Sequence, residues 1–106
     1  MAAVKLAFHP NLLPLIRDGK KICTTRRNQH GNVGDVFVIE GVEFRIRAIH
    51  QSYLGTVRDN LYLLEGFPSP NAFQETWEYL YDGSFEDSMI VFSHWFTPTR
   101  RLWDVE

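Results

Sequence analysis

Residues 36–48 read VFVIEGVEFRIRA, and this stretch predicts the centre of the fold. Apolar residues at every second position from 42 to 48 alternate with charged ones, which is typical of a strand with one buried face and one wet face. The apolar run 36–39 comes just before Glu40-Gly41, a dipeptide that suits a tight turn. The stretch therefore predicts a β-hairpin.

Outward from this hairpin, apolar spacing and the positions of Gly, Pro and capping residues predict the remaining elements. They are a strand over 4–8, a helix capped by Asn11 and stopped at Gly19, a strand over 22–27, a helix from a capping box at Thr56 and Asp59 to Gly66, a helix from Ser69-Pro70 to Asp82-Gly83, and a strand over 89–96. Many short strands in a short chain indicate an α+β fold, a small β-barrel with short helices around its rim.

Length and composition indicate one globular domain. A chain of 106 residues suits a single domain over 1–106, with a core over about 4–96 and a tail over 97–106. The 44% of hydrophobic residues supply a core, and no apolar run approaches the roughly 20 residues of a membrane-spanning helix. The N-terminus lacks the pattern of a secretory signal, and Cys23 is a lone cysteine. These features favour a reducing, cytoplasmic setting.

Common metal and catalytic patterns are missing from the sequence. The four histidines lie at least 20 residues apart and only one cysteine is present, so no local zinc site is predicted. No glycine-rich phosphate loop, nucleophile elbow or HExxH motif occurs. We therefore expect neither a metal nor a cofactor, and we expect Cys23 to be a small core residue rather than a nucleophile.

Charge is concentrated in one segment. The net charge of −2 argues against a protein that holds nucleic acid mainly by bulk electrostatics. Residues 17–30 nevertheless carry +4, which leaves −6 for the rest of the chain. This segment contains Gly19–Arg27, GKKICTTRR, where hydroxyl groups and cations lie together. On an extended strand Thr24 and Arg26 share one face, because side chains alternate.

Composition alone leaves two interpretations of this segment open. Cations suit the end of a helix because they complement its dipole, and threonine is an ordinary strand residue. The alternative is a site in which Thr24 and Arg26 share a pocket with Lys21, which sits in the turn after Gly19.

The order of the motifs resembles the ASCH family, small domains of the PUA-like superfamily with a β-barrel fold. The resemblance rests on three motifs. The first is a helix end followed by the spaced residues Gly19, Lys21, Thr24 and Arg26, and the second is the turn Val33-Gly34-Asp35 before a strand. The third is Leu64-Glu65-Gly66-Phe67, followed by Ser69, Phe73 and Trp77. These elements span nearly the whole chain, from about residue 4 to residue 96.

The version of the motif that contains threonine is similar to that of the bacterial N4-acetylcytidine amidohydrolases, which remove the acetyl group from that nucleoside. The resemblance implies that Lys21, Thr24 and Glu65 are catalytic and that Arg26 assists them at the substrate. The positive segment adds Lys20 and Arg27 as substrate-binding residues. A nucleoside or RNA is the expected partner. No membrane or obligatory protein partner is predicted, and the oligomeric state stays open.

Amide hydrolysis needs a nucleophile, a base, an acid for the leaving amine and a donor for the oxyanion. Thr24, Lys21, Glu65 and Arg26 can fill these roles in that order. Lysine amines are almost all protonated at neutral pH, so the base role requires Lys21 to lose a proton. This hypothesis favours a Glu65 that is protonated, or paired with Arg26 rather than with Lys21.

Two other functions suit the same residues. A non-catalytic RNA- or nucleotide-binding module would use the basic pocket to contact phosphates and aromatic rings to stack bases; its cations would be Lys20, Lys21, Arg26, Arg27 and Arg45 or Arg47. An RNase or a nucleotide-binding regulator ranks third, because cations beside a hydroxyl also suit phosphate chemistry.

Overall fold

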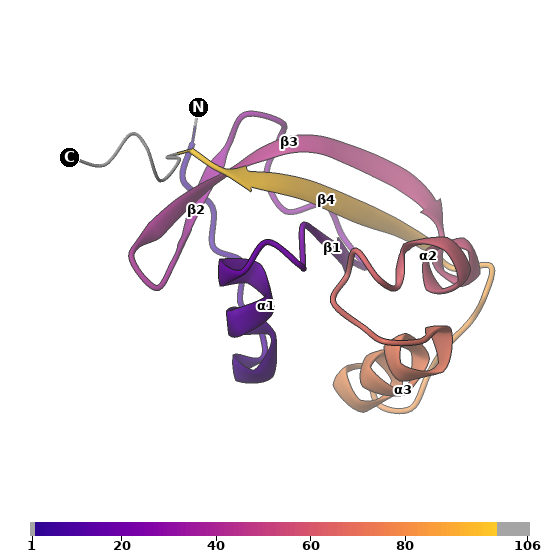
Figure 1. Ribbon diagram of the computed structural model, residues 1–106. Coiled ribbons are helices and arrows are strands. Elements are labelled where there is room, and N and C mark those ends of the chain that lie inside the picture. The colour runs from indigo at the N-terminus through magenta and orange to yellow at the C-terminus, as the bar shows by residue number, and fades with distance from the viewer. Residues whose placement is uncertain (1, 100–106) are drawn as a thin grey trace.

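The computed structural model describes residues 2–99 as a curled four-stranded sheet with helices along one side and one end (Figure 1). The strands are β1 (Cys23–Arg26), β2 (Val36–Ile39), β3 (Val42–Tyr53) and β4 (Ile90–Pro98), and the helices are the 3-10 helix η1 (Pro10–Leu12), α1 (Leu13–Arg17), α2 (Leu54–Leu61) and α3 (Pro70–Leu80). Among these helices, none is both long enough and apolar enough to cross a membrane.

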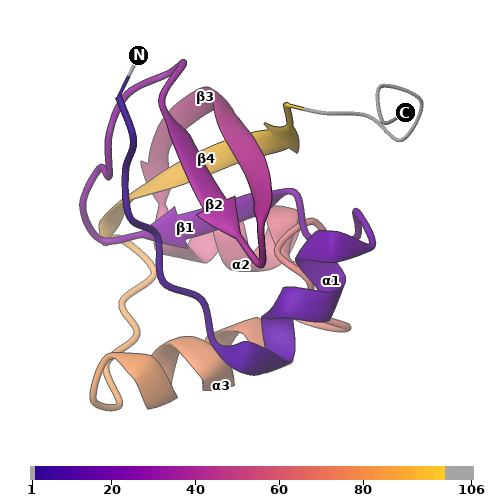
Figure 2. The ribbon, with the colours of Figure 1, turned by 90° about the vertical axis from the view of Figure 1, so that its left-hand side faces the viewer.

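The sheet has the strand order β1-β4-β3-β2, and all three pairs of strands are antiparallel. The register between β3 and β4 shifts between Ile46 and Ala48. Such a bulge bends a strand and increases its twist, so the sheet curls into a half-barrel (Figure 2). Strand β1 lies at one edge, which leaves its outer side open toward the helices.

The predicted hairpin is present as β2 and β3, with Ile39 opposite Val42. Its two turn residues, Glu40 and Gly41, have φ angles of 49° and 80°. A two-residue hairpin loop favours positive φ at both positions because the twist of that turn matches the twist of the strands. The turn therefore places Phe37 opposite Phe44.

Two hydrophobic clusters stabilise the molecule. One fills the half-barrel, where the rings of Phe37 and Phe96 lie 5.2 Å apart and the rings of Phe37 and Phe44 lie 5.5 Å apart. The second lies between α2, α3 and β4; its buried members are Leu54, Val57, Phe73, Trp77 and Val91. Helix α3 is thereby fixed against the sheet. It begins as predicted, with the Ser69 hydroxyl accepting the Ala72 N–H at 3.1 Å and proline at its first position.

The predicted strand over 4–8 was wrong. Only an isolated bridge between Ala3 and Val36 forms at this edge of β2. Further along, the Ala7 carbonyl accepts a hydrogen bond from Arg26 Nη2 at 2.7 Å instead of pairing with a strand. The side chains of Leu6 and Phe8 still pack against the half-barrel core.

The starts of two helices also differ from the prediction. The segment after residue 9 divides into η1 and α1, because Pro14 has no N–H to donate to the carbonyl four residues earlier. His9 rather than Asn11 is the cap, since its Nδ1 accepts the Asn11 N–H at 3.2 Å. Helix α2 begins at Leu54 rather than at Thr56, and it ends at Leu61 instead of continuing to Gly66.

Tertiary hydrogen bonds explain the early start of α2. The N–H groups of Leu54 and Gly55 donate to the carbonyls of Met89 and Asp87 at 2.8 and 3.0 Å. The start of the helix is thus satisfied by the segment before β4, and no capping side chain is needed. At the other end of the chain, β4 continues to Pro98, so it includes the first two residues of the predicted tail. Residues 100–106 of that tail lie outside the described residues.

We predict that the half-barrel core is sensitive to the loss of a single methyl group. Ile46→Val should lower the free energy of unfolding by about 0.5–1.5 kcal/mol, because Ile46 is fully buried. Ile90→Val is the matched control, since Ile90 is 43% exposed and should lose much less. Urea denaturation followed by tryptophan fluorescence measures both values, and equal losses in the two variants would contradict this account of the core.

Candidate active site

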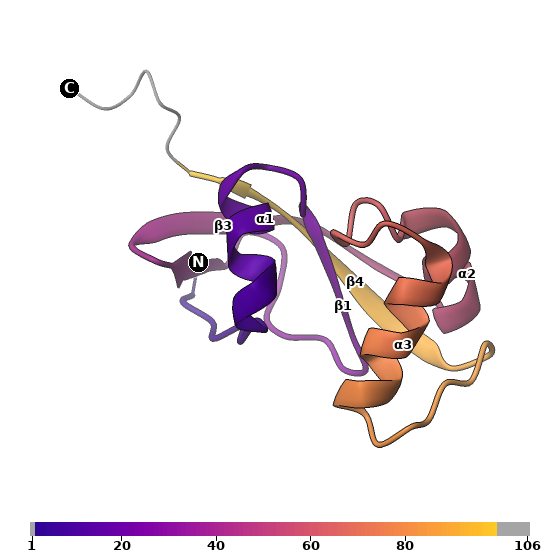
Figure 3. The ribbon, with the colours of Figure 1, turned by 60° about the horizontal axis from the view of Figure 1, so that its bottom comes forward.

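A cavity of about 350 Å³ lies where the N-terminal segment, β1, the turn after α2 and helix α3 meet. Figure 3 shows β1 running between α1 and α3 on this side of the molecule. The lining of the cavity includes the four residues that the sequence predicted to act together, namely Lys21, Thr24, Arg26 and Glu65. Thr25 also lines it. The cavity therefore brings residues from four separate parts of the chain to one place.

Lys21 is buried, with 2% of its surface exposed, and its Nζ makes three hydrogen bonds. It donates to the Cys23 carbonyl and the Glu65 carbonyl, both at 2.8 Å, and to Glu65 Oε1 at 3.1 Å. Three acceptors match the three N–H donors of an ammonium group. The geometry is thus that of a protonated lysine in an ion pair with Glu65.

Glu65 is as deeply buried as its partner, with 3% of its surface exposed. Its Oε2 accepts the Thr25 hydroxyl at 2.5 Å and lies 3.5 Å from Cys23 Sγ. The Thr25 hydroxyl lies 2.8 Å from the Ser93 hydroxyl, which continues the network onto β4. Both carboxylate oxygens therefore have partners, which a buried charge requires.

The position of Glu65 depends on the glycine after it. Gly66 has a φ angle of +97°, in the region that favours glycine. A Cβ atom there would lie 3.1 Å from Leu15 Cδ1 and 3.4 Å from Lys21 Cβ. The glycine in the Glu65-Gly66 pair thus allows the turn to approach Lys21 closely.

Thr24 and Arg26 share the other face of β1, as strand alternation predicts. Arg26 Nε donates to Thr24 Oγ1 at 3.1 Å, and the Arg26 guanidinium lies over the Phe8 ring at 5.1 Å. Burial lowers the pKa of Arg26. Because Arg26 uses a lone pair of Thr24 Oγ1, the hydroxyl proton of Thr24 can point elsewhere in the cavity.

The expected pairing of Glu65 was wrong. One alternative of the sequence hypothesis had Glu65 paired with Arg26 rather than with Lys21, whereas Glu65 pairs with Lys21. The physical reason is parity: the Arg26 guanidinium lies on the Thr24 face of β1, where it bonds Thr24 and the Ala7 carbonyl.

Sequence reasoning missed Thr25 and Ser93. No signal in a single sequence links these two hydroxyls to Glu65. Thr25 lies 40 residues from Glu65 along the chain, and Ser93 lies 68 residues from Thr25. The two remaining predicted residues, Lys20 and Arg27, are exposed and do not line the cavity. The Arg27 guanidinium instead lies over the Tyr81 ring at 4.6 Å.

His94, on the neighbouring strand β4, contacts the backbone of Thr24. It is fully buried; its Nε2 accepts the backbone N–H of His30 at 2.9 Å, and its Nδ1 lies 3.2 Å from the Thr24 carbonyl. This pair of contacts suits a neutral ring with its proton on Nδ1. Burial lowers the pKa of His94, and the neighbouring His30 and Arg26 lower it further, although the bond to the Thr24 carbonyl opposes them.

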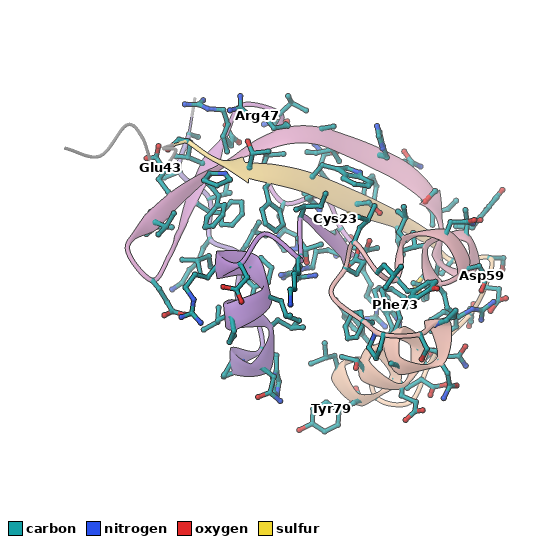
Figure 4. All side chains as sticks on the ribbon, in the orientation of Figure 1. Cys23, Glu43, Arg47, Asp59, Phe73 and Tyr79 are labelled. Carbon is teal, nitrogen blue, oxygen red and sulfur yellow. The ribbon has the colours of Figure 1, made fainter. Side chains whose placement is uncertain are left out.

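Cys23 has the properties of a core residue. Its side chain is fully buried, and Figure 4 shows it between the sheet and the helices. Burial, followed by the adjacent Glu65 carboxylate, raises the pKa of its thiol. A thiol without access to the thiolate form is a poor nucleophile. Within residues 2–99, no three His, Cys, Asp or Glu side chains lie together as a metal-binding group.

Aromatic rings form part of the cavity wall. Phe67, Phe73, Trp77 and Tyr81 line it, and the rings of Trp77 and Tyr81 lie 4.3 Å apart. Flat rings beside a buried polar cluster suit a flat ligand that carries one polar end.

Comparison with known proteins identifies the fold. No protein-family model matches the sequence, and no curated protein matches it. The structure is similar to an ASCH domain from Lactobacillus crispatus, with a TM-score of 0.71 and 15% identity over 92% of this chain and 78% of that one. It is also similar to the hypothetical protein PH0355, with a TM-score of 0.70 and 18% identity over 92% of this chain and 99% of that one.

A third similar structure is PF0455 from Pyrococcus furiosus, with a TM-score of 0.64 and 21% identity over 94% of this chain and 96% of that one. At these identities the likeness concerns the fold. The predicted α+β architecture with a curled sheet and short helices is confirmed.

We predict that His94 stays neutral in the folded chain at a pH where a free imidazole is half protonated. The ordinary pKa is about 6.5, and its value in the folded state is lower, so the unfolded chain takes up the proton first as the pH falls. The free energy of unfolding is therefore not reduced by His94 above about pH 6.5, and it falls as the pH drops below that value. NMR titration of the ring, with the urea-unfolded chain as reference, measures this, and a folded-state pKa at or above the reference would contradict it.

We also predict that the Thr25 hydroxyl stabilises the fold through Glu65. Thr25→Val should lower the free energy of unfolding by about 1–3 kcal/mol, because a buried carboxylate oxygen loses its hydroxyl donor. Thr25→Ser keeps the hydroxyl and should lose clearly less. Urea denaturation of both variants is the measurement. Equal losses would show that methyl packing, and not the hydrogen bond, is what Thr25 contributes.

Proposed function

We propose that this chain, which has the ASCH fold of the PUA-like class, is an amidohydrolase that removes an acyl group from an N4-acylated cytidine-type nucleoside. The observation that carries the proposal is the buried Lys21–Glu65 pair in the same cavity as the Thr24 hydroxyl and the Arg26 guanidinium. A hydroxyl, an amine, a carboxyl group and a cation are the four groups that hydrolysis of an amide needs.

The first step requires a neutral amine, and the observed ion pair can supply one. Lys21 Nζ lies 3.1 Å from Glu65 Oε1, so one proton can pass from the ammonium to the carboxylate. The result is a neutral amine and a neutral acid with the same total charge. Burial favours this exchange, because both charges of the ion pair have been removed from water.

Acyl transfer then restores the original charges. Lys21 takes the proton of Thr24 as Thr24 Oγ1 attacks the acyl carbon, and Arg26 stabilises the negative charge on the carbonyl oxygen. The C–N bond breaks as Glu65 gives its proton to the leaving amine, which leaves an acyl-threonine ester. Water hydrolyses this ester, which yields the free acid and regenerates Thr24.

The aromatic walls support a nucleobase as the leaving group. Phe67, Trp77 and Tyr81 line the cavity and give it an aromatic surface that suits a flat heterocycle. Base–aromatic contacts of this kind are worth about 1–3 kcal/mol each and depend little on the sequence of a nucleic acid. A plain aliphatic amide would use these walls less well.

The alternative is a non-catalytic RNA- or nucleotide-binding module. It is favoured by the exposure of Lys20 and Arg27, which lie outside the cavity where phosphates could reach them. Lys21 fits this alternative less well, because all three of its donors already have acceptors in the protein.

We predict that the purified protein releases cytidine from N4-acetylcytidine. Chromatography measures the cytidine that is released. Thr24→Ala should abolish release, and Lys21→Met and Glu65→Gln should each lower kcat/KM by at least about 100-fold, because general acid and base groups contribute roughly that much. Thr56→Ala is the matched control, since Thr56 is an exposed threonine outside the cavity.

The binding alternative predicts a different pattern. Under it no acylated cytidine is cleaved, Thr24→Ala changes nothing, and affinity for single-stranded RNA falls steeply with salt, with a log-log slope of about −0.7 per phosphate contact. Circular dichroism of each variant checks that a loss of cytidine release is not caused by a loss of folding.

A further inference from the structure

A second cavity of about 280 Å³ adjoins the first. The two share four lining residues, namely His9, Leu12, Phe67 and Thr76. They are therefore neighbouring parts of one groove between η1 and α3. The first part contains the reacting groups, and the second opens away from them.

The second cavity differs from the first in its chemistry. Besides the shared residues it is lined by Asn11, Glu75 and Tyr79, so it offers an amide, a carboxylate and a phenol. Tyr79 is 79% exposed and extends outward from α3 (Figure 4). Lysine and arginine are absent from the described lining of this cavity, whereas the first cavity contains both.

Glu75 lies on the groove side of α3, where it lines the second cavity. The amide of Asn71, one turn earlier in the helix, donates a hydrogen bond to Glu75 Oε1. Tyr79 lies one turn later, so Glu75 and Tyr79 share one helix face. A carboxylate on the wall of a cavity is a good acceptor for hydroxyl groups and a poor neighbour for another anion.

The shape of the proposed substrate matches this division. In an N4-acylated cytosine, the scissile amide on C4 and the sugar on N1 lie at opposite ends of the ring. When the amide is placed beside Thr24, the sugar must lie away from the reacting groups, toward the open part of the groove. We infer that the second cavity binds the sugar of the substrate, with Glu75 accepting its hydroxyl groups, and that it disfavours a phosphate on that sugar.

This inference rests on the proposed function and is tested with three acylated substrates: N4-acetylcytosine, N4-acetylcytidine and N4-acetylcytidine 5′-monophosphate. The wild type should have the highest kcat/KM for the nucleoside. Glu75→Ala should lower the preference for nucleoside over base by about tenfold, which corresponds to one charge-assisted hydrogen bond. Glu75→Gln should raise kcat/KM for the monophosphate relative to the nucleoside, because the repelling charge is gone. Glu78→Gln, on the same helix but outside both cavities, should change neither ratio.

The outcomes separate the two proposals. If all three compounds are cleaved with equal kcat/KM, or if the Glu75 variants leave both ratios unchanged, the sugar site is wrong while the amidohydrolase function stands. If none is cleaved, the proposed function is wrong. The sugar site is then decided by calorimetry of cytidine and cytidine 5′-monophosphate: tighter binding of cytidine that weakens in Glu75→Ala supports it, and any other result overturns it.

Discussion

The buried ion pair between Lys21 and Glu65 is the interaction on which the rest of the site depends. Two charges removed from water are tolerated only when every donor and acceptor has a partner, and removing one partner of such a pair typically costs about 3–5 kcal/mol. Here the partners come from the Cys23 carbonyl, the Glu65 carbonyl and the Thr25 hydroxyl. Strand β1 and the turn after α2 must therefore stay together, which places the cavity between them.

The position of β1 at the edge of the sheet explains how one short strand serves two sets of contacts. Alternation sends Thr25 toward Glu65 and Thr24 toward Arg26. In the middle of a sheet these two faces would belong to separate layers. At an edge they meet around the outer side of the strand, and both threonines line one cavity. The buried His94 on β4 contacts the Thr24 carbonyl, and Lys21 Nζ donates to the Cys23 carbonyl, so both contacts help to hold this edge strand.

Local chemistry in the sequence was sufficient for some features and not for others. The hairpin over 36–48 and the start of α3 at Ser69-Pro70 follow from residues adjacent in the chain, as does the shared face of Thr24 and Arg26. The predicted cap at Asn11 failed because His9, two residues earlier, caps that helix. The predicted start at Thr56 failed because the distant carbonyls of Met89 and Asp87 satisfy an earlier start of α2. The pairing of Glu65 with Lys21 spans 44 residues, and no periodicity specifies a contact at that distance.

The contacts made by the cations of residues 17–30 help to determine which ligands the groove can bind. The charge of +4 over residues 17–30 suggests a surface for anions, yet much of it is used within the protein. Lys21 is bonded to Glu65, Arg26 to Thr24 and the Ala7 carbonyl, and Arg27 lies over Tyr81. Lys21 and Arg26, held in this way, orient side chains and stabilise charge inside the cavity more than they gather phosphates from solution. Together with Glu75 in the outer part of the groove, this arrangement favours an uncharged ligand over a polyanion.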